Sequence, residues 1–73
     1  MPPTAEEWLD AFAAALGRPA PTAEERQALL ELASVAAHAS ERRAAPIACW
    51  IAASAGVPPR EARERAEALQ LGE

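Results

Sequence analysis

The 73-residue sequence has no lysine, asparagine or tyrosine, and it has only one cysteine and one histidine. A single cysteine cannot form a disulfide within the chain, which is typical of proteins from a reducing compartment. One cysteine and one histidine also cannot supply the ligands of a zinc site. No apolar run reaches the roughly 18 residues that a membrane-spanning helix needs, and the first residues, MPPTAEEW, lack the pattern of a signal peptide. We therefore expect a cytoplasmic protein that holds no metal ion or cofactor.

Basic residues are fewer than acidic ones, and the seven arginines and 11 carboxylates give a net charge of −4. A negatively charged chain repels nucleic-acid phosphates on average, so the charge argues against DNA or RNA as a partner. The sequence also lacks a glycine-rich phosphate loop and a Ser/His/Asp set. Because so few acids, bases and nucleophiles could act together, we expect no catalytic residues and no enzyme activity.

Alanine is abundant, with 21 residues, whereas β-branched residues are rare. Alanine is the best helix former, so this composition predicts an all-α fold, in one small domain over residues 1–73. A chain this short buries only about 60% of the surface that its unfolded form exposes, so its core is marginal. The few large side chains, Trp8 and Trp50 among them, are therefore expected in the core.

Two copies of the motif TAEE mark helix starts, at residues 4–7 and 22–25. In this capping box the threonine hydroxyl accepts from the backbone N–H three residues on, and the glutamate accepts from the threonine N–H. Helices over residues 5–16 and 23–40 follow, the first ending before Gly17, which can adopt the left-handed conformation of a helix stop. Pro46 suits a first helical position. Together with a helix stop at Gly56, Pro46 predicts a third helix over residues 46–55. A fourth helix is predicted over residues 59–70.

The third predicted helix carries no charge. A helix that is apolar on all sides is usually enclosed by other helices or covered by a partner. We expect a compact bundle of the four helices packed around the third, although a homodimer that shares this helix satisfies the composition equally well. If a partner protein covers the helix, we expect Ile47 and Trp50 to form the contact.

The stretch HASERRAAPIACW, residues 38–50, joins the second and third helices and concentrates the rarer side chains. His38 lies near the end of the second predicted helix, and Arg42 and Arg43 lie between that helix and the third, where backbone N–H groups and positive charge can together hold a phosphate or a carboxylate. We therefore assign them as a candidate contact or anion site. The alternative is that all three only compensate the helix dipole and cap the helix ends.

The segment IAASAGVPPREARERAEAL, residues 51–69, resembles the helix-turn-helix of bacterial repressors. It shares an Ala-Gly-Val turn and small residues in both helices, and the resemblance implies that Arg60 and Arg63 face the major groove of DNA. Glu61, Glu64 and Glu67 offset the positive charge of these arginines. DNA binding through the fourth helix is therefore an alternative function.

Two longer stretches, EEWLDAFAAALG and LLELASVAAHASERRAAPIACWIAASAG, resemble a small actinobacterial family of helical domains of unassigned function. The matching positions of the joint between the helices are Ala37, His38, Arg42, Ala44, Ala45 and Pro46. Ala39 and Arg43 replace residues that are often glycine and proline in that family.

Domains of that family occur alone or behind a nucleotidyltransferase-like domain that resembles molybdenum-cofactor guanylyltransferase. The resemblance therefore implies a non-catalytic interaction module, an accessory in the biosynthesis of molybdopterin guanine dinucleotide. Its protein partner would then be a nucleotidyltransferase-type enzyme. A small anion- or nucleotide-binding protein is the remaining alternative.

Overall fold

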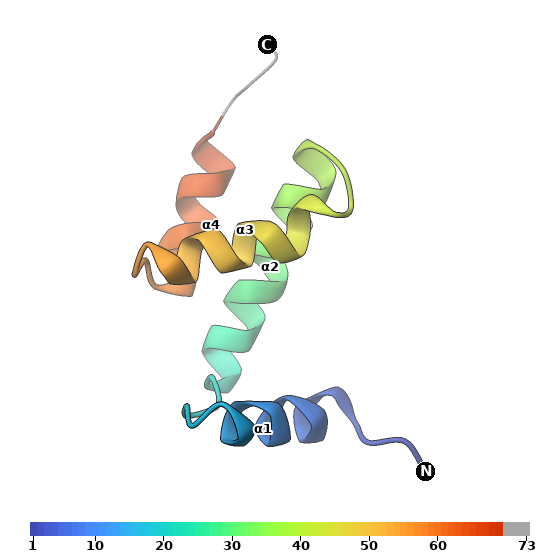
Figure 1. The fold of residues 1–73 in the computed structure, drawn as a ribbon. Helices are drawn as coiled ribbons and strands as arrows, with labels where there is room; N and C mark the ends of the chain where they lie inside the picture. The colour runs from blue at the N-terminus through green and yellow to red at the C-terminus, as the bar shows by residue number, and fades with distance from the viewer. Residues whose placement is uncertain (70–73) are drawn as a thin grey trace.

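The computed structural model describes residues 1–69 and shows four α-helices joined by short turns, with no strand in that range (Figure 1). The helices are α1 (Ala5–Ala15), α2 (Ala23–Ala39), α3 (Ala44–Ser54) and α4 (Pro59–Ala68). The predicted all-α fold with four helices is confirmed. The fourth helix ends at Ala68, before the predicted end, because Leu69 is already extended; the predicted last residue, 70, lies outside the described residues.

The two capping boxes fix the starts of α1 and α2, as predicted. Thr4 Oγ1 accepts from Glu7 N at 3.1 Å, and Thr4 N donates to Glu7 Oε1 at 2.9 Å. The same two bonds join Thr22 and Glu25, at 3.1 and 2.8 Å. Each box satisfies N–H groups that have no partner within a helix, so both helices begin at a defined residue.

Glycines end α1 and α3, again as predicted. Gly17 and Gly56 have φ angles of 69° and 74°, in the left-handed region that favours glycine. The N–H groups of Gly17 and Arg18 donate to carbonyls in the last turn of α1, at 3.0 and 2.9 Å. Those of Gly56 and Val57 do the same on α3, both at 3.1 Å. This pairing is the Schellman motif, which satisfies the free carbonyls of a helix end.

The start of α3 differs from the prediction, because the helix begins at Ala44 rather than at Pro46. The turn before it supplies acceptors, with Ala44 N 2.9 Å from Glu41 O and Ala45 N 3.1 Å from Arg42 O. Pro46 still lies in the first turn, where a backbone N–H has no partner within the helix. Proline is tolerated throughout that turn, so its presence does not mark one particular residue as the start.

The central helix is α2, which packs against both α3 and α4, whereas α3 and α4 touch over a short stretch. Among the described residues, the buried side chains are those of Leu32 on α2 and Ala62 on α4, which are 3% and 8% exposed. This arrangement differs from the predicted one, in which the third helix lay at the centre.

The orientation of α3 explains that difference, because α3 turns small side chains toward α2 and large ones toward solvent. Ala48 and Ala52 are partly buried, while Ile47, Trp50 and Ile51 are 57% to 70% exposed. Alanines let two helix axes approach closely, so an alanine-lined side packs on α2 without help from larger residues. The core position expected for Trp50 is therefore not observed.

The N-terminal helix α1 stands apart from the other three (Figure 1). No Cα atom of α1 lies within 8 Å of a Cα atom in another helix. Within residues 1–69, one ion pair joins α1 to another helix, with Arg26 Nη2 of α2 2.6 Å from Asp10 Oδ1. Trp8, also expected in the core, is half exposed. The radius of gyration is 13.3 Å, whereas a compact domain of this length has about 11 Å.

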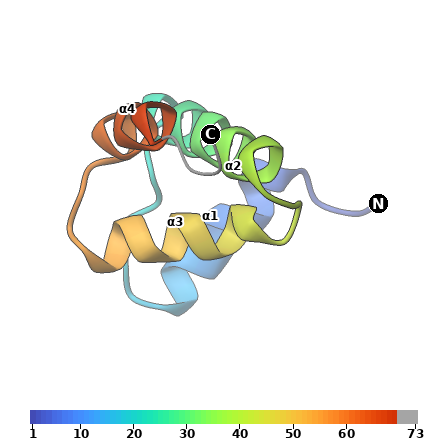
Figure 2. The same cartoon turned by 90° about the horizontal axis from the view of Figure 1, so that it is seen from above.

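Seen from above, α2 and α4 lie side by side, and α3 crosses them on one side (Figure 2). α1 lies on that same side of α2, below α3 (Figures 1 and 2). The face of α2 on which α3 lies therefore also carries α1, and no Cα atom of α1 lies within 8 Å of a Cα atom of α3.

Candidate functional site

The joint between α2 and α3 holds the three residues of the predicted contact or anion site. His38 lies in the last turn of α2, and its Nδ1 is 2.7 Å from the carbonyl oxygen of Ser34 and 3.3 Å from the Ser34 hydroxyl. The imidazole is therefore held against its own helix. With the proton on Nδ1, it donates to the Ser34 carbonyl one turn back.

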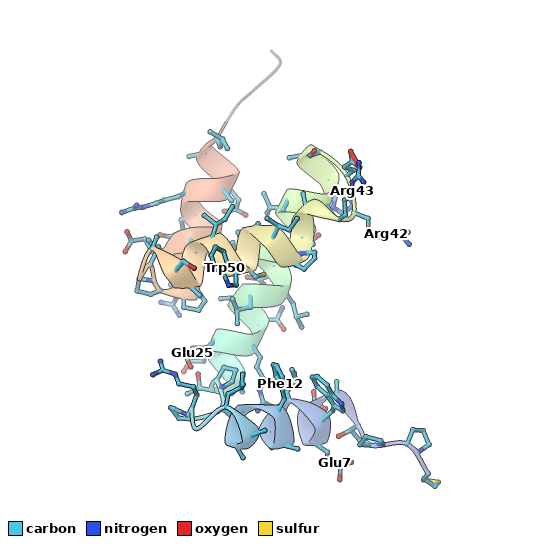
Figure 3. The ribbon with its side chains drawn as sticks, in the orientation of Figure 1. Glu7, Phe12, Glu25, Arg42, Arg43 and Trp50 are labelled. Carbon is cyan, nitrogen blue, oxygen red and sulfur yellow. The ribbon has the colours of Figure 1, made fainter. Side chains whose placement is uncertain are left out.

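The two arginines of the joint are directed differently. Arg43 is the N-cap residue of α3, without a side-chain cap bond, and its Nε lies 2.7 Å from Glu41 Oε1. In Figure 3 the side chains of Arg42 and Arg43 leave the turn in different directions. Within residues 1–69, no hydrogen bond or ion pair joins His38 to either arginine. The structure thus places the three residues on one joint but does not show them converging on one point.

The helix that follows the joint exposes the predicted partner surface. Ile47 and Trp50 are 58% and 70% exposed, and Ile51 lies beside them on the same side of the helix. In Figure 3, Trp50 lies on the side of α3 that α2 does not cover. Each large side chain of α3 is therefore available to another molecule.

A second apolar surface, which the sequence analysis assigned to the core, lies on α1. Its stripe contains Trp8, Leu9, Phe12 and Leu16, each between 38% and 61% exposed. Trp8 and Phe12 stack with ring centroids 5.0 Å apart and planes 22° from parallel. Figure 3 shows Phe12 pointing from α1 toward the level of α3. Within the stripe, the stacked pair of Trp8 and Phe12 forms an exposed aromatic surface.

Leu30 of α2 is a further exposed apolar side chain. It follows Arg26, the residue that reaches α1, by one helical turn, so the two side chains leave α2 on the same side. Leu30 is 67% exposed, whereas Leu32, two residues later on the same helix, is buried. We call the combined surface of α1, α2 and α3 the apolar face. It comprises Trp8, Leu9, Phe12, Leu16, Leu30, Ile47, Trp50 and Ile51.

A shallow groove between α3 and α4 adjoins the apolar face at Ile51. Leu32 and Ala62 lie at its base, and Ala52 and Val57 are among the other residues that line it. Its lining is almost entirely apolar, with Arg65 at one edge. Small side chains leave this groove open, so the apolar surface continues from α3 toward α4.

The arginines implied by the helix-turn-helix resemblance are engaged with carboxylates. Arg60 Nη2 lies 3.6 Å from Glu24 Oε2 of α2, and Arg63 Nε lies 3.3 Å from Glu31 Oε1. Arg63 also lies 3.4 Å from Glu67 on its own helix. A DNA phosphate would have to compete with these pairs, so the geometry gives the DNA-binding alternative no support.

Cys49 is partly buried on α3, with its Sγ 3.9 Å from the carbonyl oxygen of Leu29. Burial disfavours the thiolate and raises the pKa of the Cys49 thiol. In the described part of the chain, no three His, Cys, Asp or Glu side chains gather in a way that could hold a metal ion. None of the helices within residues 1–69 is both long and apolar enough to span a bilayer.

One comparison with known proteins gives a match. Residues 1–71 match the model of the family described as Domain of unknown function (DUF6457). The chain belongs to this family. No curated protein and no solved structure matches the chain. The resemblance stated from the sequence, to helical domains of unassigned function, agrees with this membership. Because the match includes α1, the exposed stripe on that helix is part of the family domain.

Sequence reasoning missed α1 as a candidate contact surface. Its amphipathic stripe was visible, but an amphipathic helix in a small domain is most often a core helix. The signal that could have found it is the linker GRPAPT, residues 17–22, which turns the chain away after α1. Two prolines there prevent a continuous helix and restrict how α1 can fold back.

Proposed function

We propose that this member of DUF6457 is a non-catalytic module that binds another protein chain through its apolar face. The observation that supports this function is the exposure of the eight large side chains of the face, each between 38% and 70%. A large apolar side chain offers about 200 Å² when fully exposed, so the exposed part of the face amounts to roughly 800–900 Å².

An apolar surface of this size is unusual for a protein that acts alone. Monomeric soluble proteins rarely expose contiguous apolar patches of more than a few hundred Å², and larger patches mark interaction sites. Two of the eight side chains are tryptophans, the residue type most enriched in the energetically dominant parts of protein interfaces. The face therefore fits a protein partner better than it fits a small polar ligand.

The chemistry of the remaining residues favours a module without catalysis. The raised pKa of Cys49 keeps its thiol neutral, and a neutral thiol is a poor nucleophile. His38 is directed at the Ser34 carbonyl on its own helix and not toward a nucleophile.

For the partner, the resemblance stated above suggests a nucleotidyltransferase-type enzyme of molybdenum-cofactor biosynthesis. In this proposal the chain is an accessory to that enzyme. Arg42 and Arg43, next to α3, would add positive charge at the edge of the contact.

Titration of the ¹⁵N-labelled chain with a purified molybdenum-cofactor guanylyltransferase tests the accessory role. We expect the amide resonances of α3 and of the joint at residues 38–46 to shift or broaden. Trp50→Glu should abolish this change, because it places a charge in the face. Leu69→Glu is the matched control, since Leu69 is equally exposed at 65% but lies at the end of α4, outside the face. An unchanged wild-type spectrum at saturating enzyme would contradict the accessory role.

A further inference from the structure

We infer that the apolar face binds a second copy of this chain, so that the protein forms a two-fold symmetric dimer. This inference rests on the proposed function, because it names the chain that the face binds. Three observations support a second copy: the small core of the single chain, the area of the face, and the charges at its two edges.

The core of the single chain is too small to account for the ordered structure of all four helices. Within residues 1–69 only Leu32 and Ala62 are buried. Small domains with so little core usually require disulfides, metals or association with further copies. The single cysteine excludes an internal disulfide, and the described residues offer no metal cluster. Association with a second copy is the remaining route that the chain can supply by itself.

The N-terminal helix by itself also has too little packing within the single chain. α1 has 11 residues, and isolated helices shorter than about 12–15 residues are marginal in water. Its capping box, its glycine stop and the Trp8–Phe12 stack are local to α1, and within residues 1–69 the ion pair between Asp10 and Arg26 is the side-chain link to another helix. A helix whose apolar stripe is covered by another chain would be held in place by packing.

The area of the face agrees with the size of a stable dimer interface. The face offers roughly 800–900 Å² of apolar side chain by the same measure of about 200 Å² per side chain. A standard specific interface buries about 800 Å² on each partner. Either α1 or α3 alone would supply about half of that area, so the interface needs both helices of each copy.

The charges at the edges of the face make it complementary to itself. On α1 every charged residue is acidic: Glu6, Glu7 and Asp10. On the α3 side the helix has no charge, and the turn just before it carries Arg42 and Arg43 together with Glu41, which pairs with Arg43, so that turn has a net charge of +1. A two-fold axis that sets α1 of one copy against α3 of the other brings the acidic edge next to the basic edge. A two-fold interface requires this kind of self-complementary surface.

Sedimentation velocity of the isolated chain over a range of concentrations tests the dimer. We expect a species of twice the 7.7 kDa chain mass, dissociating on dilution. Phe12→Glu and Trp50→Glu should each shift the midpoint of dissociation to at least 100-fold higher concentration. Leu69→Glu should leave it unchanged. Because Phe12 lies on a helix that does not pack on the others, Phe12→Glu should keep α2, α3 and α4 folded.

Tryptophan fluorescence gives a second readout, since both tryptophans of the chain lie in the face. Their emission should move to longer wavelength on dilution, with the same midpoint as the sedimentation data. A wild-type chain that stays helical and monomeric at all concentrations would overturn the inference. Dimers that form equally well with Phe12→Glu and Trp50→Glu would also overturn it, because they would use another surface.

A charge exchange tests the arrangement of the two copies. Glu6→Arg and Arg42→Glu should each weaken the dimer severalfold, and the double variant should recover most of the loss. Glu6 is suited to this test because it takes no part in the capping box. A double variant weaker than both single variants would overturn the pairing of α1 with α3.

The two experiments can contradict the dimer and the proposed accessory role independently of each other. If the chain is monomeric but its resonances still shift on addition of the guanylyltransferase, the dimer is contradicted and the accessory role is supported. A dimeric chain whose spectrum does not respond to the enzyme would support the second copy and contradict the accessory role.

Discussion

The two capping boxes provide a comparison within one chain, because they are chemically the same but begin helices in different surroundings. Thr4 begins α1, which contacts no other helix backbone, whereas Thr22 begins α2, which packs against both α3 and α4. Their hydroxyl contacts are equal in length, at 3.1 Å. Thr4→Ala and Thr22→Ala therefore remove the same local interaction from a detached helix and from the central one.

The expected magnitude follows from the cost of losing a threonine cap, about 1 kcal/mol within a range of roughly 0.5–2 kcal/mol. For Thr22→Ala this loss lowers the free energy of unfolding of α2, α3 and α4 together. A domain of this size loses about 4–8 °C in melting temperature per kcal/mol. For Thr4→Ala the loss enters only the helix–coil equilibrium of α1. The melting temperature of the other helices should then change by less than about 2 °C, by the same conversion.

The assay is thermal unfolding followed by circular dichroism at a protein concentration where the chain sediments as a monomer. Amide hydrogen exchange shows which helices each substitution destabilises. Thr22→Ala should lower the midpoint and speed exchange across α2, α3 and α4. Thr4→Ala should speed exchange in α1 alone. Equal decreases in the midpoint for both variants would refute the reasoning, because they would show that α1 unfolds together with the core.

Two further predictions concern α2 and α3. Leu32→Ala should destabilise the fold by about 3 kcal/mol, because it opens a cavity in the core. At a concentration where the chain is monomeric, Leu30→Ala should lower the free energy of unfolding by less than about 0.5 kcal/mol, as is usual for an exposed site. Urea unfolding of the two variants measures both changes. Since burial raises the pKa of Cys49, its thiol should react with iodoacetamide more slowly than a free thiol at pH 8. The neutral Cys49 thiol therefore contributes to the free energy of unfolding at pH values below the pKa that this thiol has in the unfolded chain. This contribution is lost as the pH rises through the higher pKa that the thiol has in the folded chain. Modification as fast as in the urea-unfolded chain would contradict the burial.

Much of the secondary structure could be predicted because its signals are local. The TAEE boxes and the two glycines predicted four helix boundaries to within one residue. The ion pair of Glu61 with Arg65 is also local, because residues four apart are neighbours on one helix. The start of α3 was predicted two residues late, because proline fits several positions of a first turn.

The candidate site could be predicted only in part. Ile47 and Trp50 were assigned to a partner surface, and the structure places them on the exposed side of α3. Trp8 and Phe12 were assigned to the core instead. An amphipathic stripe has the same periodicity whether it faces the core of its own chain or another molecule. The sequence of α1 alone therefore could not distinguish the two.

The sequence by itself determined most of the helix boundaries, because caps, left-handed glycines and prolines act over four residues or fewer. Only the tertiary structure decided which side of α3 packs on α2, and that α1 stands away from the core. Those features depend on contacts between residues far apart in the chain, such as Asp10 with Arg26 or Arg63 with Glu31. An alanine-rich helix such as α3 offers several sides of nearly equal packing quality. Its orientation is therefore set by its neighbours and not by its own composition.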